Sequence, residues 1–267
     1  MKGFCVAVAE VYVRLQRQRF EVVVRNLLPV FAGDRLAAEK ATSRLHRNFA
    51  VKLVDLWRVE SGVTVRDWLT NSSELEIIQA ARRRGHGILF VTLHLGNWEH
   101  GGQLLNQLGL PLTVLTQAEP DDGLTALRIA SRRRCGVETL IIGQDSFAFI
   151  EVIKRLQAGA ALALSLDRPP PQGGVAVELF GRPFTAPAAA AELARASGCA
   201  LIGVTIVRRR SGYAVTVLPE FTYDRRALGN HEARRQLNQQ ILRAFEPAIR
   251  ENIDQWYQFV PIWPKTG

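Results

Sequence analysis

From Gly87 onward, short apolar segments alternate with amphipathic ones, and this alternation constrains the fold more than any other feature of the sequence. The apolar segments have the length of buried strands, and several amphipathic segments end at a glycine, where a left-handed C-cap is expected. We therefore expect an α/β fold with a central, mostly parallel mixed sheet flanked by helices. The predicted strands are 87–93, 111–116, 137–142, 160–166, 175–180, 200–207 and 213–218, and the predicted helices between and after them are 97–108, 122–134, 146–158, 187–197 and 231–251.

The first 85 residues lack this alternation and carry apolar positions at helical spacing. We expect an N-terminal helical region at 1–85 and an α/β core at 86–267, together forming one domain. The predicted helices cover 4–28, 34–59 and 72–85, with Pro29, Asp34, Ser72 or Ser73 before Glu74, and Gly85 as the residues that mark their ends.

Charge and motif content exclude several classes of protein. The net charge of +9, from 34 Lys and Arg against 25 Asp and Glu, favours an anionic partner such as nucleic acid, anionic lipid or a phosphorylated substrate. No helix-turn-helix, RRM or zinc-finger pattern supports nucleic-acid binding, and the GxSxG and GxGxxG motifs of hydrolases and dehydrogenases do not occur. The apolar stretch 3–13 is shorter than the roughly 20 residues that span a bilayer, so we expect a soluble or peripheral protein.

The segment FVTLHLGNWEHGG, residues 90–102, places a titratable pair after a predicted strand. His94 follows the strand, and Glu99 falls in the first turn of the next predicted helix. Open α/β sheets bind ligands at such strand ends. Because residues five apart on an ideal helix point about 140° from each other, His94 and Glu99 can meet only if His94 lies on the loop before the helix.

In that arrangement Glu99 would hold one imidazole nitrogen, and the other nitrogen would take a proton from a hydroxyl. The alternative is structural, because Glu is favourable in a first helical turn through the helix dipole and a single His at a strand end often only packs. These residues alone leave both interpretations open.

The sequence HLGNWE resembles the HxxxxD/E signature of the lysophospholipid acyltransferase superfamily. Its form is similar to the lipid A late acyltransferase branch (lauroyl and myristoyl transferases) and to the phosphatidylinositol mannoside acyltransferases. The resemblance extends over roughly residues 20–260. Other matching segments are Arg25-Asn26-Leu27, which resembles an upstream R-N-L element, 132–159, LSLDRPP at 164–170, and ELFGRPFTAPAAAAELARASGCALIGV at 178–204.

The resemblance implies an O-acyltransferase in which His94 is the general base and Glu99 its partner. The donor would be an acyl thioester, acyl-ACP or acyl-CoA, and the acceptor a hydroxyl of a glycolipid or lipid A-like molecule, attacked directly without an acyl-enzyme. Neither a metal nor a cofactor is implied, and nucleic acid is not an expected partner. The expected location is the cytoplasmic face of the cell inner membrane, with peripheral attachment to the membrane surface.

Further residues are predicted to bind substrate, each with a structural alternative. Backbone amides near Asn97 are candidates for oxyanion stabilisation. The run that includes Arg132 and Arg134 resembles part of a family segment and would bind phosphate, or else only cap a helix end. Asp167 and Arg168 follow a buried strand and would contact the acceptor, or else form a salt-bridged loop. Phe180 and Gly181 would shape the substrate channel, or else only form a turn.

The ends of the sequence differ from the lipid A enzymes, which open with a hydrophobic anchor and close with a Trp-His-Arg-Arg-like block. Here the arginine-bearing helix at 4–28 is expected either to pack against the core or to lie in the membrane interface. The aromatic residues of QWYQFVPIW are expected to be buried or interfacial. A non-catalytic lipid-binding relative and a lysophospholipid acyltransferase of phospholipid synthesis remain the alternative functions.

Overall fold

The computed structural model describes residues 2–65, 75–118, 121–142 and 146–264. Within these residues six strands form one sheet in the order β3-β2-β4-β1-β7-β8. Neighbouring strands are parallel except for β7 and β8, which form an antiparallel pair. The predicted mostly parallel α/β fold is therefore confirmed. The strands are β1 (Ile88–Thr92), β2 (Leu112–Thr116), β3 (Glu138–Ile141), β4 (Ala161–Ser165), β7 (Ala200–Arg209) and β8 (Gly212–Val217).

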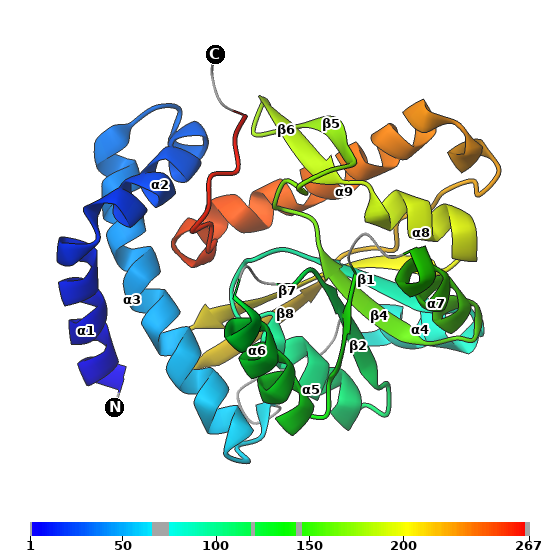
Figure 1. The fold of residues 1–267 in the computed structure, drawn as a ribbon, viewed down its shortest axis with the longest axis horizontal. Helices are drawn as coiled ribbons and strands as arrows, with labels where there is room; N and C mark the ends of the chain where they lie inside the picture. The colour runs from blue at the N-terminus through cyan, green and yellow to red at the C-terminus, as the bar shows by residue number, and fades with distance from the viewer. Residues whose placement is uncertain (1, 66–74, 119–120, 143–145, 265–267) are drawn as a thin grey trace.

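The two faces of the sheet are covered by different helices (Figure 1). Alternate side chains of β1, such as Leu89 and Phe90, enter opposite hydrophobic clusters because successive strand residues point to opposite faces. One cluster includes α7 (Ser146–Gln157), α8 (Ala189–Ser197) and α9 (His231–Glu251), and the other includes α4 (Leu75–Arg83) and α5 (Glu99–Gln107). The central strands are thus buried on both sides, which explains their continuous apolar sequences.

Most predicted helix ends are confirmed. α6 (Asp122–Arg134), α7, α8 and α9 match their predicted ranges closely. The glycines that follow α5, α6, α7 and α8 have φ values between 69° and 87°, as expected for left-handed C-caps: Gly109, Gly136, Gly159 and Gly198. The predicted start of the third helix at Ser72 or Ser73 lies outside the described residues.

The N-terminal helices stand beside the sheet, at the left of Figure 1. The long helix α3 (Arg35–Glu60) begins as predicted, with the Asp34 carboxylate accepting a hydrogen bond from the Ala37 amide at 3.0 Å. The single helix expected over 4–28 is wrong. The chain forms α1 (Lys2–Leu15), which packs on α3, and α2 (Arg17–Leu27), with a break at Gln16, where φ is −106° and ψ is 54°. Gln16 is neither glycine nor proline, so the sequence carried no breaking signal.

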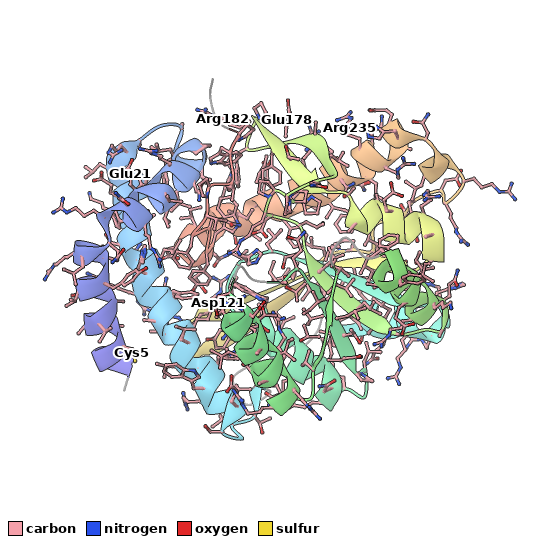
Figure 2. The ribbon with its side chains drawn as sticks, viewed as in Figure 1. Cys5, Glu21, Asp121, Glu178, Arg182 and Arg235 are labelled. Carbon is pink, nitrogen blue, oxygen red and sulfur yellow. The ribbon has the colours of Figure 1, made fainter. Side chains whose placement is uncertain are left out.

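A strand that the sequence did not predict, β6 (Arg182–Pro187), pairs antiparallel with β5 (Gly174–Leu179). Pro183 and Pro187 argued against a strand here, because proline cannot donate a hydrogen bond to a neighbouring strand. It is tolerated in β6 because β6 pairs on one side only, with β5. This hairpin packs on α9, and its charged residues Glu178 and Arg182 lie at the molecular edge near Arg235 (Figure 2). The short 3-10 turns are η1 (Leu28–Phe31), η3 (Ala227–Gly229) and η4 (Ile253–Gln255).

The residues after η4 pack against α2, so a segment near the end of the sequence contacts one near its start. The Asn26 side-chain amide on α2 donates hydrogen bonds to the Gln258 and Val260 carbonyls, at 2.9 and 2.7 Å. The Trp263 indole in turn donates to the Asn26 carbonyl at 3.0 Å. The segment 256–263, which we call the C-terminal tail, is thereby held against α2. Among the described residues no helix combines the length and apolar character needed to cross a membrane.

Candidate active site

Two ionisable residues meet at the carboxyl ends of the paired strands β1 and β4. Thr92 of β1 is in register with Ser165 of β4, and the Leu166 amide bonds to the Thr92 carbonyl at 3.1 Å. His94 and Asp167 each lie two residues beyond this matched pair. Parallel pairing therefore places the two side chains next to each other, although 73 positions separate them in sequence.

His94 and Asp167 form a hydrogen-bonded pair. His94 Nδ1 lies 2.7 Å from Asp167 Oδ1, and the His94 backbone amide donates to Asp167 Oδ2 at 2.8 Å. An ionised carboxylate only accepts hydrogen bonds, so Nδ1 carries the hydrogen and Nε2 presents a lone pair. The His94 side chain keeps 16% of its surface exposed, whereas that of Asp167 is fully buried. The imidazole is thus oriented with its basic nitrogen available to a substrate.

The C-terminal tail fixes the Asp167 carboxylate. The Trp256 indole donates to Asp167 Oδ2 at 2.8 Å and the Gln258 side-chain amide donates to the same oxygen at 2.6 Å. Burial by itself raises the pKa of Asp167, but the charge and hydrogen bond of His94, with the charge of Arg168 and the Trp256 hydrogen bond, outweigh it and hold the pKa below its usual range. Asp167 is therefore a charged partner for His94. The expectation that it contacts the acceptor is wrong, because its side chain is enclosed.

His94 is poised in its neutral form. Burial lowers its pKa most, the charge and hydrogen bond of Asp167 raise it, and the charges of Arg168 and Lys52 lower it further. The resulting pKa lies below the usual value of 6.5. A neutral imidazole with an accessible Nε2 is the state that a general base requires at physiological pH.

Glu99 binds Arg132 and not His94. Two parallel hydrogen bonds, Arg132 Nε to Glu99 Oε2 at 2.9 Å and Arg132 Nη2 to Glu99 Oε1 at 2.8 Å, join α5 to α6. The Trp98 indole donates to Glu99 Oε1 at 3.1 Å. Burial raises the pKa of Glu99, but Arg132, Lys52 and Arg128 lower it to about 2. The expected His94–Glu99 pair is replaced by His94–Asp167, because Glu99 is already helical and its side chain faces α6.

The loop between His94 and α5 is held from two sides. The Gly96 amide donates to the Gln255 carbonyl at 2.9 Å and the Asn97 amide donates to the Ile206 carbonyl at 2.7 Å. Gly96 has a φ of 65°, and a Cβ there would lie 2.0 Å from the Ile206 carbonyl oxygen. Only glycine fits this position.

Asn97 has a structural role in this loop. Its side chain is buried and donates to His100 Nε2 at 2.8 Å, and its amide is occupied by Ile206. The Asn97 amide itself is therefore already bonded, and oxyanion binding by the backbone amides near Asn97 stays a prediction.

The other residues predicted to bind substrate lie in three different places. Arg168 lies beside the pair, with Nε and Nη2 donating to the Gln258 side chain and the Tyr257 carbonyl at 3.2 and 3.1 Å. Arg134 instead pairs with Glu60 at the end of α3 at 2.7 Å. Phe180 and Gly181 form the turn of the β5–β6 hairpin, both with positive φ, and the Phe180 ring contacts Trp256 at a centroid distance of 6.0 Å. Their substrate-binding role stays a prediction.

Sequence reasoning missed several residues that build the site. Lys52 reaches it from α3, Trp98 packs edge-on against the His94 ring at a centroid distance of 5.0 Å, and Trp256 and Gln258 bind Asp167. The aromatic and amide residues of QWYQFVPIW were visible in the sequence. Their contact with Asp167 depends on the path of the tail after α9, which no local pattern reveals.

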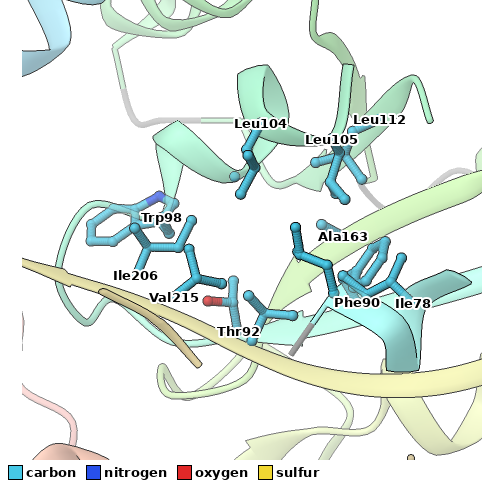
Figure 3. Close-up of a pocket in the computed structure, with 13 residues that line it drawn as sticks. Ile78, Phe90, Thr92, Trp98, Leu104, Leu105, Leu112, Ala163, Ile206 and Val215 are labelled. Carbon is cyan, nitrogen blue, oxygen red and sulfur yellow. The ribbon is translucent and has the colours of Figure 1, made fainter. Parts of the chain in front are cut away.

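An apolar cavity of about 50 Å³ opens beneath Trp98 on the α5 side of the sheet. Figure 3 shows Trp98 at one end, beside Ile206 and Val215, and Phe90 and Ile78 at the other. Thr92 supplies a hydroxyl to an otherwise apolar lining. Because Trp98 also contacts His94, the cavity begins next to the candidate base.

Comparison with known proteins identifies the family of this chain. The model of the family described as "Bacterial lipid A biosynthesis acyltransferase" matches residues 1–265. A phosphatidylinositol mannoside acyltransferase of Mycolicibacterium smegmatis is 25% identical over 213 residues, which are 78% of this chain and 68% of the relative. A protein of the same name from Mycobacterium tuberculosis is 26% identical over 190 residues, 71% of this chain and 58% of the relative. The resemblance inferred from the sequence is thereby confirmed.

Proposed function

Because this chain belongs to the family of bacterial lipid A biosynthesis acyltransferases, we propose that it transfers a fatty acyl chain from an acyl thioester to a hydroxyl of a glycolipid or lipid A-like acceptor. The observation that carries this proposal is the His94–Asp167 pair at the carboxyl edge of the sheet, with Nε2 of His94 left to accept a proton. Acyl transfer to an alcohol needs such a base, because a neutral hydroxyl is a weak nucleophile.

In the proposed reaction His94 Nε2 takes the proton of the acceptor hydroxyl as its oxygen attacks the thioester carbonyl carbon. The new C–O bond forms a tetrahedral intermediate with a negative oxygen. Collapse of this intermediate breaks the C–S bond, and the proton passes from His94 to the departing sulfur, so that an ester and a free thiol result. Asp167 stabilises the transient imidazolium through its charge and its hydrogen bond to Nδ1.

The negative oxygen of the intermediate requires donors other than the amides of Gly96 and Asn97, which are already bonded. The start of α5 follows directly, and the first N–H groups of a helix lack intrahelical partners. The amides of Trp98 and Glu99 are therefore our candidates, aided by the positive end of the helix dipole.

The apolar cavity beneath Trp98 supports a role in binding the acyl chain. Its lining is almost wholly hydrophobic, and it begins at the ring that contacts His94. A chain that enters there would bring its thioester carbon close to the base. The ion pair Glu99–Arg132 stands at the same helix start and, in this proposal, keeps α5 in place relative to α6.

Likeness to relatives supports the proposed kind of acceptor. The mycobacterial relatives are named as phosphatidylinositol mannoside acyltransferases, which supports a glycolipid acceptor here. The chain spans 68% and 58% of the length of those two relatives. Acyl-ACP and acyl-CoA are both suitable thioester donors for the chemistry described, and Arg168 beside the pair is our candidate to contact an anionic group of either substrate.

We also propose that the protein works on the membrane surface, at the cytoplasmic face of the inner membrane. α1 leaves Val8, Val11 and Leu15 between 51% and 75% exposed, and its last turn carries Arg14. An exposed apolar stripe beside arginine suits an interfacial helix on anionic lipid.

The test is an acyl-transfer assay on purified protein with acyl-CoA and acyl-ACP donors and a panel of glycolipid and lysophospholipid acceptors. We expect acceptor-dependent ester formation that is lost in His94→Ala and retained in His86→Ala, which changes an exposed histidine. Unchanged activity in His94→Ala would remove His94 as the base. No transfer to any acceptor by folded wild type would favour a lipid-binding protein without catalysis, and transfer only to lysophospholipids would move the function to phospholipid synthesis.

A further inference from the structure

Lys52 is a buried lysine on the face of α3 that meets the active site. Only 5% of its surface is exposed. Its Nζ lies 2.9 Å from the centroid of the Trp98 ring, 5.3 Å from that of Tyr257 and 5.7 Å from that of Phe49. We call these three rings the aromatic box. It draws one residue each from the helical region, the loop after β1 and the C-terminal tail.

The aromatic box does not neutralise Lys52. Within the described residues, the ion pairs at or below 4.0 Å do not include Lys52, whose nearest groups are aromatic rings. Burying a cation without a paired carboxylate is costly, and ring faces recover only part of that cost. Burial lowers the pKa of Lys52 well below its usual range, the charge of Glu99 raises it, and the charges of Arg128, Arg168 and Arg132 lower it further. A leucine or methionine would fill this place more stably.

The position of Lys52 links it to the His94–Asp167 pair. Trp98 is in contact with Lys52 on its face and with the His94 ring at its edge. The charged groups that act on His94 come from two directions: Asp167 and Arg168 from the segment after β4, and Lys52 from α3. Of these, Lys52 is the one contributed by the N-terminal helical region.

We propose that Lys52 is a positioning residue of the acyl-transfer site, a cation held over the Trp98 ring that acts through space on the adjoining His94 imidazole and on the negative oxygen of the tetrahedral intermediate. This inference rests on the proposed function for its second half, since the intermediate belongs to acyl transfer. Its first half concerns the free protein. Two positive charges in a poorly solvated site repel, so protonated Lys52 disfavours the imidazolium form of His94.

The first test measures His94 directly and needs no substrate. NMR titration of the imidazole Cε1–H resonances, with the His94 signal assigned by its loss in His94→Ala, follows the pKa in wild type and variants. We expect Lys52→Met to raise the pKa of His94 by roughly half a pH unit or more, and Lys52→Arg to leave it near the wild-type value. Lys40→Met, on the exposed side of the same helix, is the matched control and should change nothing.

The second test measures acyl transfer against pH. We expect Lys52→Met to lower kcat about tenfold or more with a smaller change in KM, and to move the acidic limb of the profile to higher pH. The wild-type rate should also fall on the alkaline side as Lys52 loses its proton. Lys52→Arg should restore most of kcat and move that alkaline limb upward, because guanidinium stays protonated.

The outcomes separate this inference from the proposed function. If Lys52→Met shifts the His94 titration but wild type transfers no acyl group, the tuning of His94 stands and the proposed acyl transfer fails. If wild type transfers acyl groups and Lys52→Met changes neither the His94 titration nor the pH profile, the inference about Lys52 is overturned. A rate loss in Lys52→Met that Lys52→Arg does not rescue, together with a lowered Tm, would also overturn it, because it would show a packing role.

Discussion

At the scale of single residues, the two carboxylates near His94 have different surroundings. Asp167 is bonded to the imidazole and Glu99 to Arg132. Both are ionised, since the pKa of each lies below its usual value. In the proposed function Asp167 is therefore the partner of His94, and Glu99 holds α5 against α6 through Arg132. Changing each carboxylate to its amide tests the two roles separately.

We predict that Asp167→Asn lowers kcat about 10³-fold, because an amide cannot stabilise the imidazolium and favours the wrong tautomer. Glu99→Gln should lower kcat much less, and its residual activity should keep the wild-type dependence on acceptor. Steady-state kinetics with a single donor and acceptor measures both. A larger loss in Glu99→Gln than in Asp167→Asn would return Glu99 to the position of dyad partner.

The same Glu99→Gln variant makes a prediction about stability. The change removes the carboxylate charge that faces the buried Arg132 guanidinium across two hydrogen bonds, and it should lower the free energy of unfolding by about 3 kcal/mol at neutral pH. The folded pKa of about 2 lies below the usual 4.5, so this stabilisation is complete above pH 4.5 and is lost as pH falls from 4.5 toward 2. Urea unfolding across that range should show the two proteins converging in acid. Glu178→Gln, at an exposed glutamate, is the control.

At the scale of elements, the loop from Leu95 to Asn97 decides where His94 points. It bonds to β7 on one side and to η4 on the other, and its glycine approaches the Ile206 carbonyl more closely than any Cβ allows. The backbone hydrogen bonds and the close approach of Gly96 to β7 therefore fix the loop.

Gly96→Ala should destabilise the protein by about 3 kcal/mol or more and abolish acyl transfer, because the methyl group would collide with backbone. Gly62→Ala is a matched control: its φ of 96° is also positive, but a Cβ there meets nothing within 4 Å. Chemical denaturation of both variants separates the cost of a positive φ from that of the collision. Equal losses would mean that close approach to Ile206 is unimportant.

The elements also show how far sequence reasoning reaches. Apart from β6, strand and helix positions from Gly87 onward were predictable, because buried strands need apolar runs and helices need caps such as Gly136 and Gly198. The position of His94 at a strand end followed from the same pattern. Its partner did not, because Asp167 is brought close by the register of β1 with β4, a pairing between distant segments. The sequence did not predict Lys52 as a site residue, because buried lysines are rare and an isolated lysine on a long helix suggests solvent exposure.

At the scale of the whole molecule, both ends of the sequence converge on the active site. Asn26 near the start holds the C-terminal tail, and the tail holds Asp167 through Trp256 and Gln258. This gives a physical reason for the resemblance at Arg25-Asn26-Leu27: Asn26 and Leu27 are both buried, and Asn26 is the polar one of the two, while the Arg25 side chain is 72% exposed.

We predict that Asn26→Ala lowers the free energy of unfolding by about 2 kcal/mol, because the Gln258 and Val260 carbonyls lose their donors in a buried setting. It should also lower kcat, although Asn26 makes no contact with His94. In Asn26→Ala, hydrogen exchange should show that backbone amides of the C-terminal tail lose protection while those of the sheet keep it. Gln18→Ala, an exposed amide on the same helix, should leave stability, exchange and rate unchanged.

The path of the tail has a consequence for how the protein is made. Asn26 and Val260 are 234 positions apart, so their contact is among the last that a chain growing from its N-terminus can form. Until the tail emerges from the ribosome, His94 can meet Asp167 but lacks the indole and amide that hold this carboxylate. An incomplete chain thus carries His94 beside a carboxylate that its two tail donors do not yet hold, and we expect the proposed acyl transfer only once synthesis has passed these donors.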